Sequence, residues 1–239
     1  MKHIIVLILL AILPLHEIRA QYNTNRLIIS GQSALYYEDY VLSIQYFNQA
    51  LAAKPYLYEP WFYRGLAKFY LDDYTGSEAD VTKAIELNPY VFNMFELRGL
   101  CRIRQKHYAQ AIDDYTRSIN LNPQNQTAWY NRALCRIEDK DYVQAQLDLD
   151  TVITRWKSYA SAYSLKAQVY LLQADTLTAD KWLDKSLQVA PYDVDAWNMR
   201  GMIALSRAEW KNADTYLSKV IHLKPKNAAN YVNLSLIHI

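Results

Sequence analysis

Apolar and small residues recur along this chain at the three- and four-residue steps of an amphipathic helix. From Trp61, the small residue Gly65 and then Phe69 lie on one face of a first helical segment. Polar residues interrupt the pattern, and a second helical segment follows that contains Val81 and Ala84 on one face. The pattern therefore predicts two short helices joined by a turn, which form a helical hairpin.

The hairpin pattern repeats every 34 residues. Prolines end five of the units, at Pro55, Pro89, Pro123, Pro191 and Pro225, with Lys157 in the one vacant place. A large residue recurs in the same register, at Leu27, Trp61, Phe95, Trp129, Tyr163, Trp197 and Tyr231, and a small residue follows four positions later in each full unit. The period predicts six full repeats, over residues 24–57, 58–91, 92–125, 126–159, 160–193 and 194–227, and a partial seventh over 228–239.

The combination of Trp61, Gly65, Tyr74, Ala84 and Pro89 at a 34-residue period resembles the tetratricopeptide repeat. The resemblance implies an all-α fold, a right-handed α-solenoid of stacked helical hairpins whose concave face is lined mainly by first helices. A single hairpin cannot bury its apolar face alone, so we expect neighbouring hairpins to cover it.

The first twenty residues have the features of a secretory signal peptide. Lys2 and His3 precede an apolar run from Ile4 to Leu13, and Ala20 is a small residue at the expected cleavage point. The run is too short to span a bilayer. We therefore expect an exported protein, periplasmic or secreted, with a repeat domain over residues 21–239 and no integral membrane segment after cleavage.

Composition argues against several classes of function. The chain has 26 Lys and Arg residues against 24 Asp and Glu residues, a formal net charge of +2 that favours no nucleic-acid partner. Four of the five glycines fall in one column of the repeat, which leaves no phosphate-binding loop. The histidines are scattered, and no Cys/His cluster is present. The sequence therefore predicts no metal site, no cofactor and no enzymatic activity.

Cys101 and Cys135 are 34 residues apart and so occupy equivalent positions on neighbouring first helices. Packed helix axes lie roughly 8 to 10 Å apart, whereas a disulfide requires Cα atoms within about 7 Å. We therefore predict two free, buried thiols, and the alternative is a redox-active pair.

Two columns of opposite charge run through the second, third and fourth repeats. Asp80, Asp114 and Asp148 form the acidic column, and the basic one comprises Lys68, Arg102 and Arg136, with Arg64, Arg98 and Arg132 one turn away. We interpret these residues as a structural ladder of ion pairs between helices, and the alternative is a ligand site.

The presumed concave face carries aromatic and apolar residues with a few charges. It lacks the lysines and asparagines with which some tetratricopeptide domains grip a C-terminal carboxylate. This composition suits an extended segment or a helix of a partner. The candidate partner-binding residues are Phe62, Tyr70, Glu96, Arg104, Tyr130 and Glu138.

These observations favour a non-catalytic scaffold, exported, that binds a partner protein or peptide in the concave groove. The alternative is the regulatory or substrate-recruiting N-terminal arm of a longer enzyme or signalling protein, because the sequence stops within the first helix of the seventh repeat. The partner's identity and the oligomeric state are left open.

Overall fold

A computed structural model describes residues 23–226, which form helices and turns and contain no strand. The all-α prediction is confirmed for this part of the chain. The predicted signal peptide and the partial seventh repeat lie outside the described residues. A first helix covers residues 23–36, and the others are α2 (Tyr40–Ala53), α3 (Tyr58–Tyr70), α4 (Tyr74–Leu87), α5 (Phe92–Arg104), α6 (Tyr108–Leu121), α7 (Gln126–Glu138), α8 (Tyr142–Arg155), α9 (Ala160–Leu172), α10 (Thr176–Val189), α11 (Val194–Ser206) and α12 (Trp210–Leu223).

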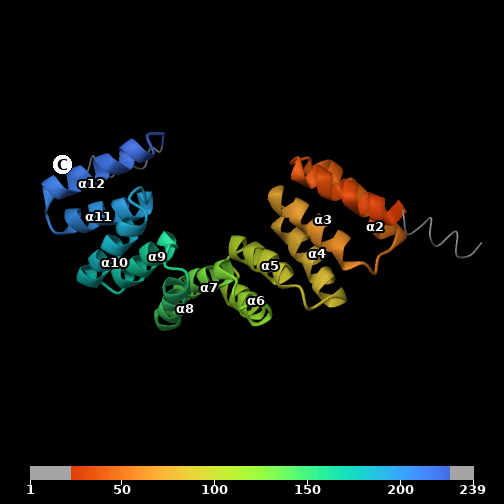
Figure 1. Cartoon of the computed structure of the whole chain (residues 1–239), viewed down its shortest axis with the longest axis horizontal. Coiled ribbons are helices and arrows are strands. Elements are labelled where there is room, and N and C mark those ends of the chain that lie inside the picture. The colour runs from red at the N-terminus through yellow and green to blue at the C-terminus, as the bar shows by residue number, and fades with distance from the viewer. Residues whose placement is uncertain (1–22, 227–239) are drawn as a thin grey trace, which may run out of the picture. The chain divides into compact units, whose positions relative to one another are not determined.

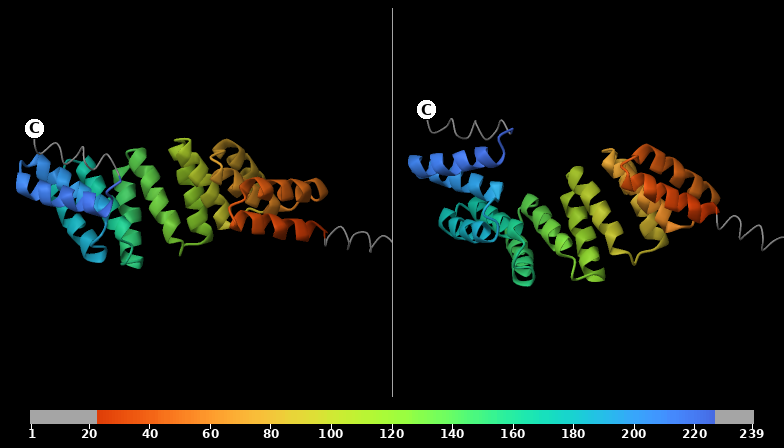
Figure 2. Two further views of the ribbon diagram at one scale, coloured as in Figure 1. Left: turned by 90° about the horizontal axis from the view of Figure 1, so that it is seen from above. Right: turned by 45° about the horizontal axis from the view of Figure 1, so that its top comes forward.

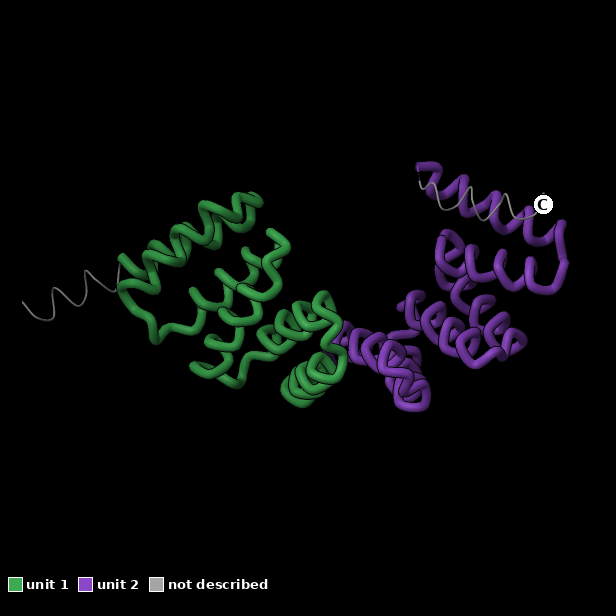
Figure 3. Tube along the Cα trace, turned by 180° about the vertical axis from the view of Figure 1, so that it is seen from behind, with its two compact units in different colours: residues 1–123 green, residues 124–239 purple. Residues whose placement is uncertain are grey.

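The chain divides into two compact units, one up to Pro123 and one from Gln124 onwards (Figure 3). Unit 1 contains the helices up to α6, and unit 2 contains α7 to α12. Within each unit, successive helices pack as antiparallel pairs, such as α3 with α4 and α9 with α10 (Figures 1 and 2). Each second helix also packs on the following first helix of the same unit, for example α4 on α5 and α8 on α9. Hairpins therefore stack on one another within each unit.

The turn inside each hairpin uses one residue in the left-handed backbone region. These residues are not glycines, and they recur every 34 positions with φ between 56° and 63°, at Glu38, Asp72, Lys106, Lys140, Ala174 and Ala208. The following residue caps the second helix. Asp73 and Asp141 accept hydrogen bonds from the amides of Gly76 (2.9 Å) and Gln144 (3.2 Å). The carboxylate thus fixes the first turn of the second helix.

Small residues allow the two helices of a hairpin to approach closely. A methyl group on Gly65 would lie 2.7 Å from Val81, and one on Gly201 would lie 2.5 Å from Leu217. Both separations are shorter than carbon atoms tolerate. The small column of the repeat therefore marks the helix crossings.

The aromatic residues of the large column are anchored by hydrogen bonds to the end of the preceding repeat. The indole N–H of Trp61 donates to the carbonyl of Pro55 (2.8 Å), and that of Trp197 donates to the carbonyl of Pro191 (2.9 Å). In the repeat without proline, the Tyr163 hydroxyl donates to the carbonyl of Lys157 (3.0 Å). The contact needs only a carbonyl, which explains why lysine can stand where proline is usual.

Candidate functional site

The six predicted partner-binding residues all lie on first helices. Phe62 and Tyr70 belong to α3, Glu96 and Arg104 to α5, and Tyr130 and Glu138 to α7. The first four are in unit 1 and the last two in unit 2. The side chains of Tyr70, Arg104 and Glu138 are exposed, and the others are partly buried.

In unit 1, the two predicted aromatic residues have different environments. Phe62 packs against a core cluster that includes Val81 and Met94, and its ring lies 5.1 Å from that of Tyr63. Tyr70 is 54% exposed and stacks on the ring of Tyr40 at 5.1 Å. Phe62 therefore contributes to the core, whereas Tyr70 offers an aromatic surface to a partner.

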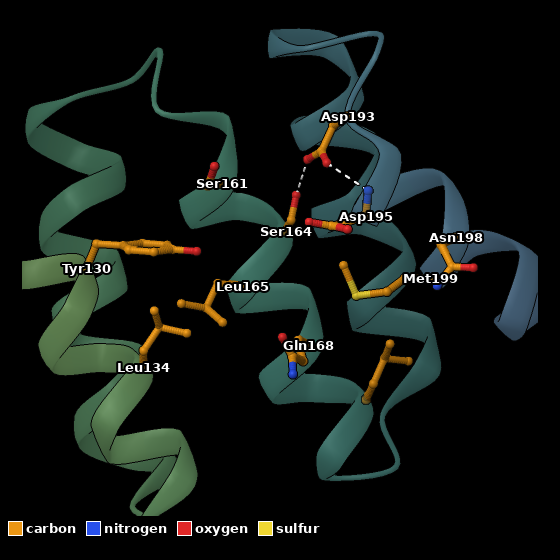
Figure 4. Close-up of a pocket in the computed structure, with 11 residues that line it drawn as sticks. Tyr130, Leu134, Ser161, Ser164, Leu165, Gln168, Asp193, Asp195, Asn198 and Met199 are labelled. Atoms are coloured by element: carbon orange, nitrogen blue, oxygen red, sulfur yellow. Dashed lines mark hydrogen bonds between the residues drawn. The ribbon is translucent and has the colours of Figure 1, made fainter. Parts of the chain in front are cut away.

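In unit 2, Tyr130 lies at a cavity of about 390 Å³ between α7, α9 and α11 (Figure 4). The cavity is lined by Tyr130, Leu134, Ser161, Ser164, Leu165, Gln168, Leu171, Asp193, Asp195, Asn198 and Met199. Tyr130 is the only one of the six predicted residues among them. Ser161, Gln168 and Asp195 are exposed, so the cavity opens to solvent.

The cavity exists because the fifth repeat has small residues where earlier repeats have large ones. Ser164 occupies the repeat position of Phe62, Glu96 and Tyr130. Its short side chain leaves free space between Tyr130 on one side and Met199 on the other (Figure 4). The predicted columns of the first-helix face, extended by one and two periods, lead to Ser161, Ser164, Gln168, Asp195 and Asn198. The sequence therefore contained the signal for this site, but the fifth and sixth repeats were not searched for it.

Asp193 fixes one wall of the cavity. Its Oδ1 accepts hydrogen bonds from the amides of Asp195 (3.1 Å) and Ala196 (3.3 Å) and so caps α11. Its Oδ2 accepts hydrogen bonds from the hydroxyls of Ser186 (2.9 Å) and Ser164. The carboxylate thus joins the start of α11 to α9 and α10. Within residues 23–226, neither Asp193 nor Asp195 forms an ion pair.

The cavity has a negative electrostatic field that acts on Tyr130. Burial raises the pKa of Tyr130 to about 12, with further contributions from Tyr159, Asp195 and Asp193. The Tyr130 ring also makes an edge contact with that of Tyr159, at 5.2 Å between centroids. Tyr130 is therefore a neutral hydrogen-bond donor and acceptor at ordinary pH.

The predicted charge ladder is confirmed as a set of ion pairs between the two helices of a hairpin. Each aspartate is held by two cations. Asp114 accepts from Arg98 at 2.7 Å and from Arg102 at 2.8 Å. Asp80 is paired in the same way with Arg64 and Lys68, and Asp148 with Arg132 and Arg136. These carboxylates are occupied within the fold, which favours the structural interpretation over a ligand site.

The last two described hairpins replace the aspartate of the ladder by an aromatic ring. Lys166 lies at the repeat position of Arg132, and its ammonium is 4.3 Å from the centroid of the Trp182 ring. Arg200 lies 5.6 Å from the centroid of Tyr216. Both cations also pair with aspartates of second helices, Lys166 with Asp150 and Arg200 with Asp184. Cation–π contacts thus substitute for the buried carboxylate.

Cys101 and Cys135 are free and buried, as predicted. Burial raises the pKa of the Cys101 thiol to about 11 and that of Cys135 to about 12. The Cys101 thiol donates a hydrogen bond to the Ser77 hydroxyl (3.1 Å). Raised pKa values make both thiols poor nucleophiles, so they do not resemble a redox pair.

Two searches of the described residues gave negative results. No group of three or more His, Cys, Asp or Glu side chains in residues 23–226 is placed to hold a metal ion. No helix in the same range is both long and apolar enough to cross a membrane.

Comparisons with known proteins relate this chain to the tetratricopeptide repeat. A tetratricopeptide repeat family model matches residues 97–146. PilW, a widely conserved type IV pilus biogenesis factor, superimposes with a TM-score of 0.75 and 15% identity, over 90% of this chain and 98% of PilW. PilF of Pseudomonas aeruginosa gives a TM-score of 0.72 and 14% identity, over 90% and 98% of the two chains. A tetratricopeptide repeat protein of Parabacteroides merdae gives 0.68 and 16%, over 91% and 85%. No curated protein matches this chain in sequence, and these structural similarities concern the fold alone.

Proposed function

Because the chain is a tetratricopeptide repeat protein, we propose that it is a non-catalytic scaffold that binds a partner protein or peptide on the face formed by its first helices. The observation that carries this proposal is the open cavity between α7, α9 and α11. It combines an aromatic ring, aliphatic side chains and polar groups, which is the usual composition of a surface that binds a peptide.

The proposal assigns different roles to the six predicted residues. Tyr130 contacts the partner inside the cavity, and Glu138 extends the surface along α7. In unit 1, Tyr70 and Arg104 provide exposed contacts. Phe62 and Glu96 are partly buried and contribute less of their surface to a partner.

We propose further that the protein acts after export, in the periplasm or outside the cell. The support is the N-terminal sequence, in which two basic or titratable residues precede the apolar run from Ile4 to Leu13. Cleavage near Gln21 would remove this segment before the scaffold meets its partner.

The test is to obstruct the cavity without disturbing the hairpin stack. Ser161 is exposed at the cavity mouth, so Ser161→Trp should fill the space and leave the helices intact. Val143 is 66% exposed on the second helix α8, and Val143→Trp provides a matched control. Capture of exported proteins on the immobilised chain, quantified by mass spectrometry, should lose its specific partner with Ser161→Trp only. A partner retained by Ser161→Trp would show that binding occurs elsewhere.

A further inference from the structure

We propose that the cavity between α7, α9 and α11 binds a basic side chain, lysine or arginine, of an extended partner segment. This inference rests on the function proposed above and specifies the chemistry of the partner. It arises from the charge, the shape and the unused acceptors of the cavity wall.

The charge of the cavity is of one sign. Asp193 and Asp195 are among its eleven lining residues, and none of those residues is a lysine, an arginine or a histidine. Neither carboxylate has a cationic partner in the part of the chain that the structure describes. The ladder aspartates, such as Asp148 with Arg132 and Arg136, are each neutralised by two cations. The fold thus pairs its buried carboxylates but leaves the two at the cavity available to a positive ligand.

The two carboxylates have separate tasks. Asp193 already accepts four hydrogen bonds, two from amides and two from the hydroxyls of Ser164 and Ser186. Those donors are all neutral, so Asp193 keeps its charge and supplies an attractive field. Asp195 is exposed, and in Figure 4 its side chain points from α11 toward α9. It is the residue placed to accept a hydrogen bond directly from an ammonium or guanidinium group.

The remaining walls suit the aliphatic part of a basic side chain. Leu134, Leu165 and Met199 line the cavity together with the ring of Tyr130. Lysine and arginine bury their methylene groups on such surfaces while the charged end reaches polar groups. Ser161 and Gln168 at the mouth can bond to the backbone of the bound segment. A peptide that ends in a carboxylate would meet repulsion from Asp193 and Asp195 here.

The experiment selects ligands without assuming their identity. A randomised library of short displayed peptides is panned on the full chain, and the enriched peptide is titrated by fluorescence anisotropy. Asp193→Asn with Asp195→Asn removes the charge while asparagine preserves the cap of α11. Asp139→Asn with Asp141→Asn is the matched control, because it removes the same charge from unit 2, includes the cap of α8 and leaves the cavity lining unchanged.

Enriched peptides are expected to contain lysine or arginine. The cavity double variant should bind them roughly tenfold or more weakly, and the control variant should bind them nearly as the natural chain does. Replacing the basic residue by norleucine should produce a similar loss. Peptides without a basic residue that are blocked by Ser161→Trp would overturn this inference and leave the proposed function standing. Failure to enrich any peptide, or enriched peptides that ignore Ser161→Trp, would overturn both.

Discussion

At the scale of single residues, the left-handed turn positions are a source of local strain. Ala174 has φ of 62° and is exposed, so its side chain pays the steric cost of this region without a compensating contact. Ala174→Gly should raise the free energy of unfolding by roughly 0.5 to 1 kcal/mol, because glycine has no Cβ to collide with the backbone.

Ala174→Val is the matched variant at the same site. A β-branched residue fits the left-handed region poorly, so it should lower the free energy of unfolding. Urea titrations of the two variants should therefore move in opposite directions from the natural chain. A shift in the same direction for both would show that backbone strain does not decide the effect.

The buried thiols make stability depend on alkaline pH. The folded pKa values of Cys101 and Cys135, about 11 and about 12, lie above the unfolded value of about 8.5. Above that value the unfolded chain loses thiol protons that the folded chain retains, so stability falls as pH rises. Between pH 7.5 and pH 10 we expect a loss of roughly 1 kcal/mol for each thiol.

Denaturant titrations at the two pH values measure this effect. Cys101→Ala with Cys135→Ala is the control, because it removes the titrating groups while retaining small side chains. The double variant should lose less stability between the two pH values than the natural chain. Identical pH dependence in both proteins would assign the alkaline loss to other groups.

At the scale of elements, the sequence predicts the hairpins well because each rests on local signals. The helical spacing of apolar residues and the small column at the crossings both recur at 34 residues, and the helices follow that register. The ladder was also predictable, because Asp148 and its cations lie at fixed offsets along the repeat. The cavity depends instead on what is missing. Ser164 gives no chemical signal by itself, and only comparison with Tyr130 one period earlier reveals the empty space.

The ladder should contribute strongly to the joining of helices within a hairpin. Asp148→Asn leaves Arg132 and Arg136 partly buried without their carboxylate, and the side chain of Asp148 itself is only 3% exposed. Removing one partner of a buried ion pair costs about 3 to 5 kcal/mol. We expect a loss at the lower end of that range, because asparagine can still accept one hydrogen bond.

The control for this prediction is an exposed ion pair on the same kind of helix. Glu86 pairs with Lys83 on α4, and the two side chains are 58% and 48% exposed. Glu86→Gln should therefore change the free energy of unfolding by less than about 0.5 kcal/mol. Urea titrations that show equal losses for Asp148→Asn and Glu86→Gln would contradict a structural role for the ladder.

At the scale of the whole molecule, the division into two units separates the parts of the first-helix face. All residues that line the cavity belong to unit 2, as do the core clusters around Leu149 and Leu183. In repeat proteins each hairpin is stabilised mainly by its neighbours, and three hairpins are about the minimum for a stable stack. Unit 2 contains three described hairpins, α7–α8, α9–α10 and α11–α12. It therefore carries its own core and its own binding cavity.

This arrangement predicts that a fragment of residues 124–239 folds and binds without unit 1. Circular dichroism should show a helical, cooperatively unfolding fragment that is less stable than the full chain, because the exposed face of α7 loses any neighbour it has there. A peptide selected on the full chain should bind the fragment within about threefold, since every side chain that lines the cavity is retained. A helical fragment that no longer binds the peptide would show that the binding surface extends into unit 1, where Tyr70 and Arg104 lie. An unfolded fragment would show that the hairpins of unit 2 depend on the stack that precedes them.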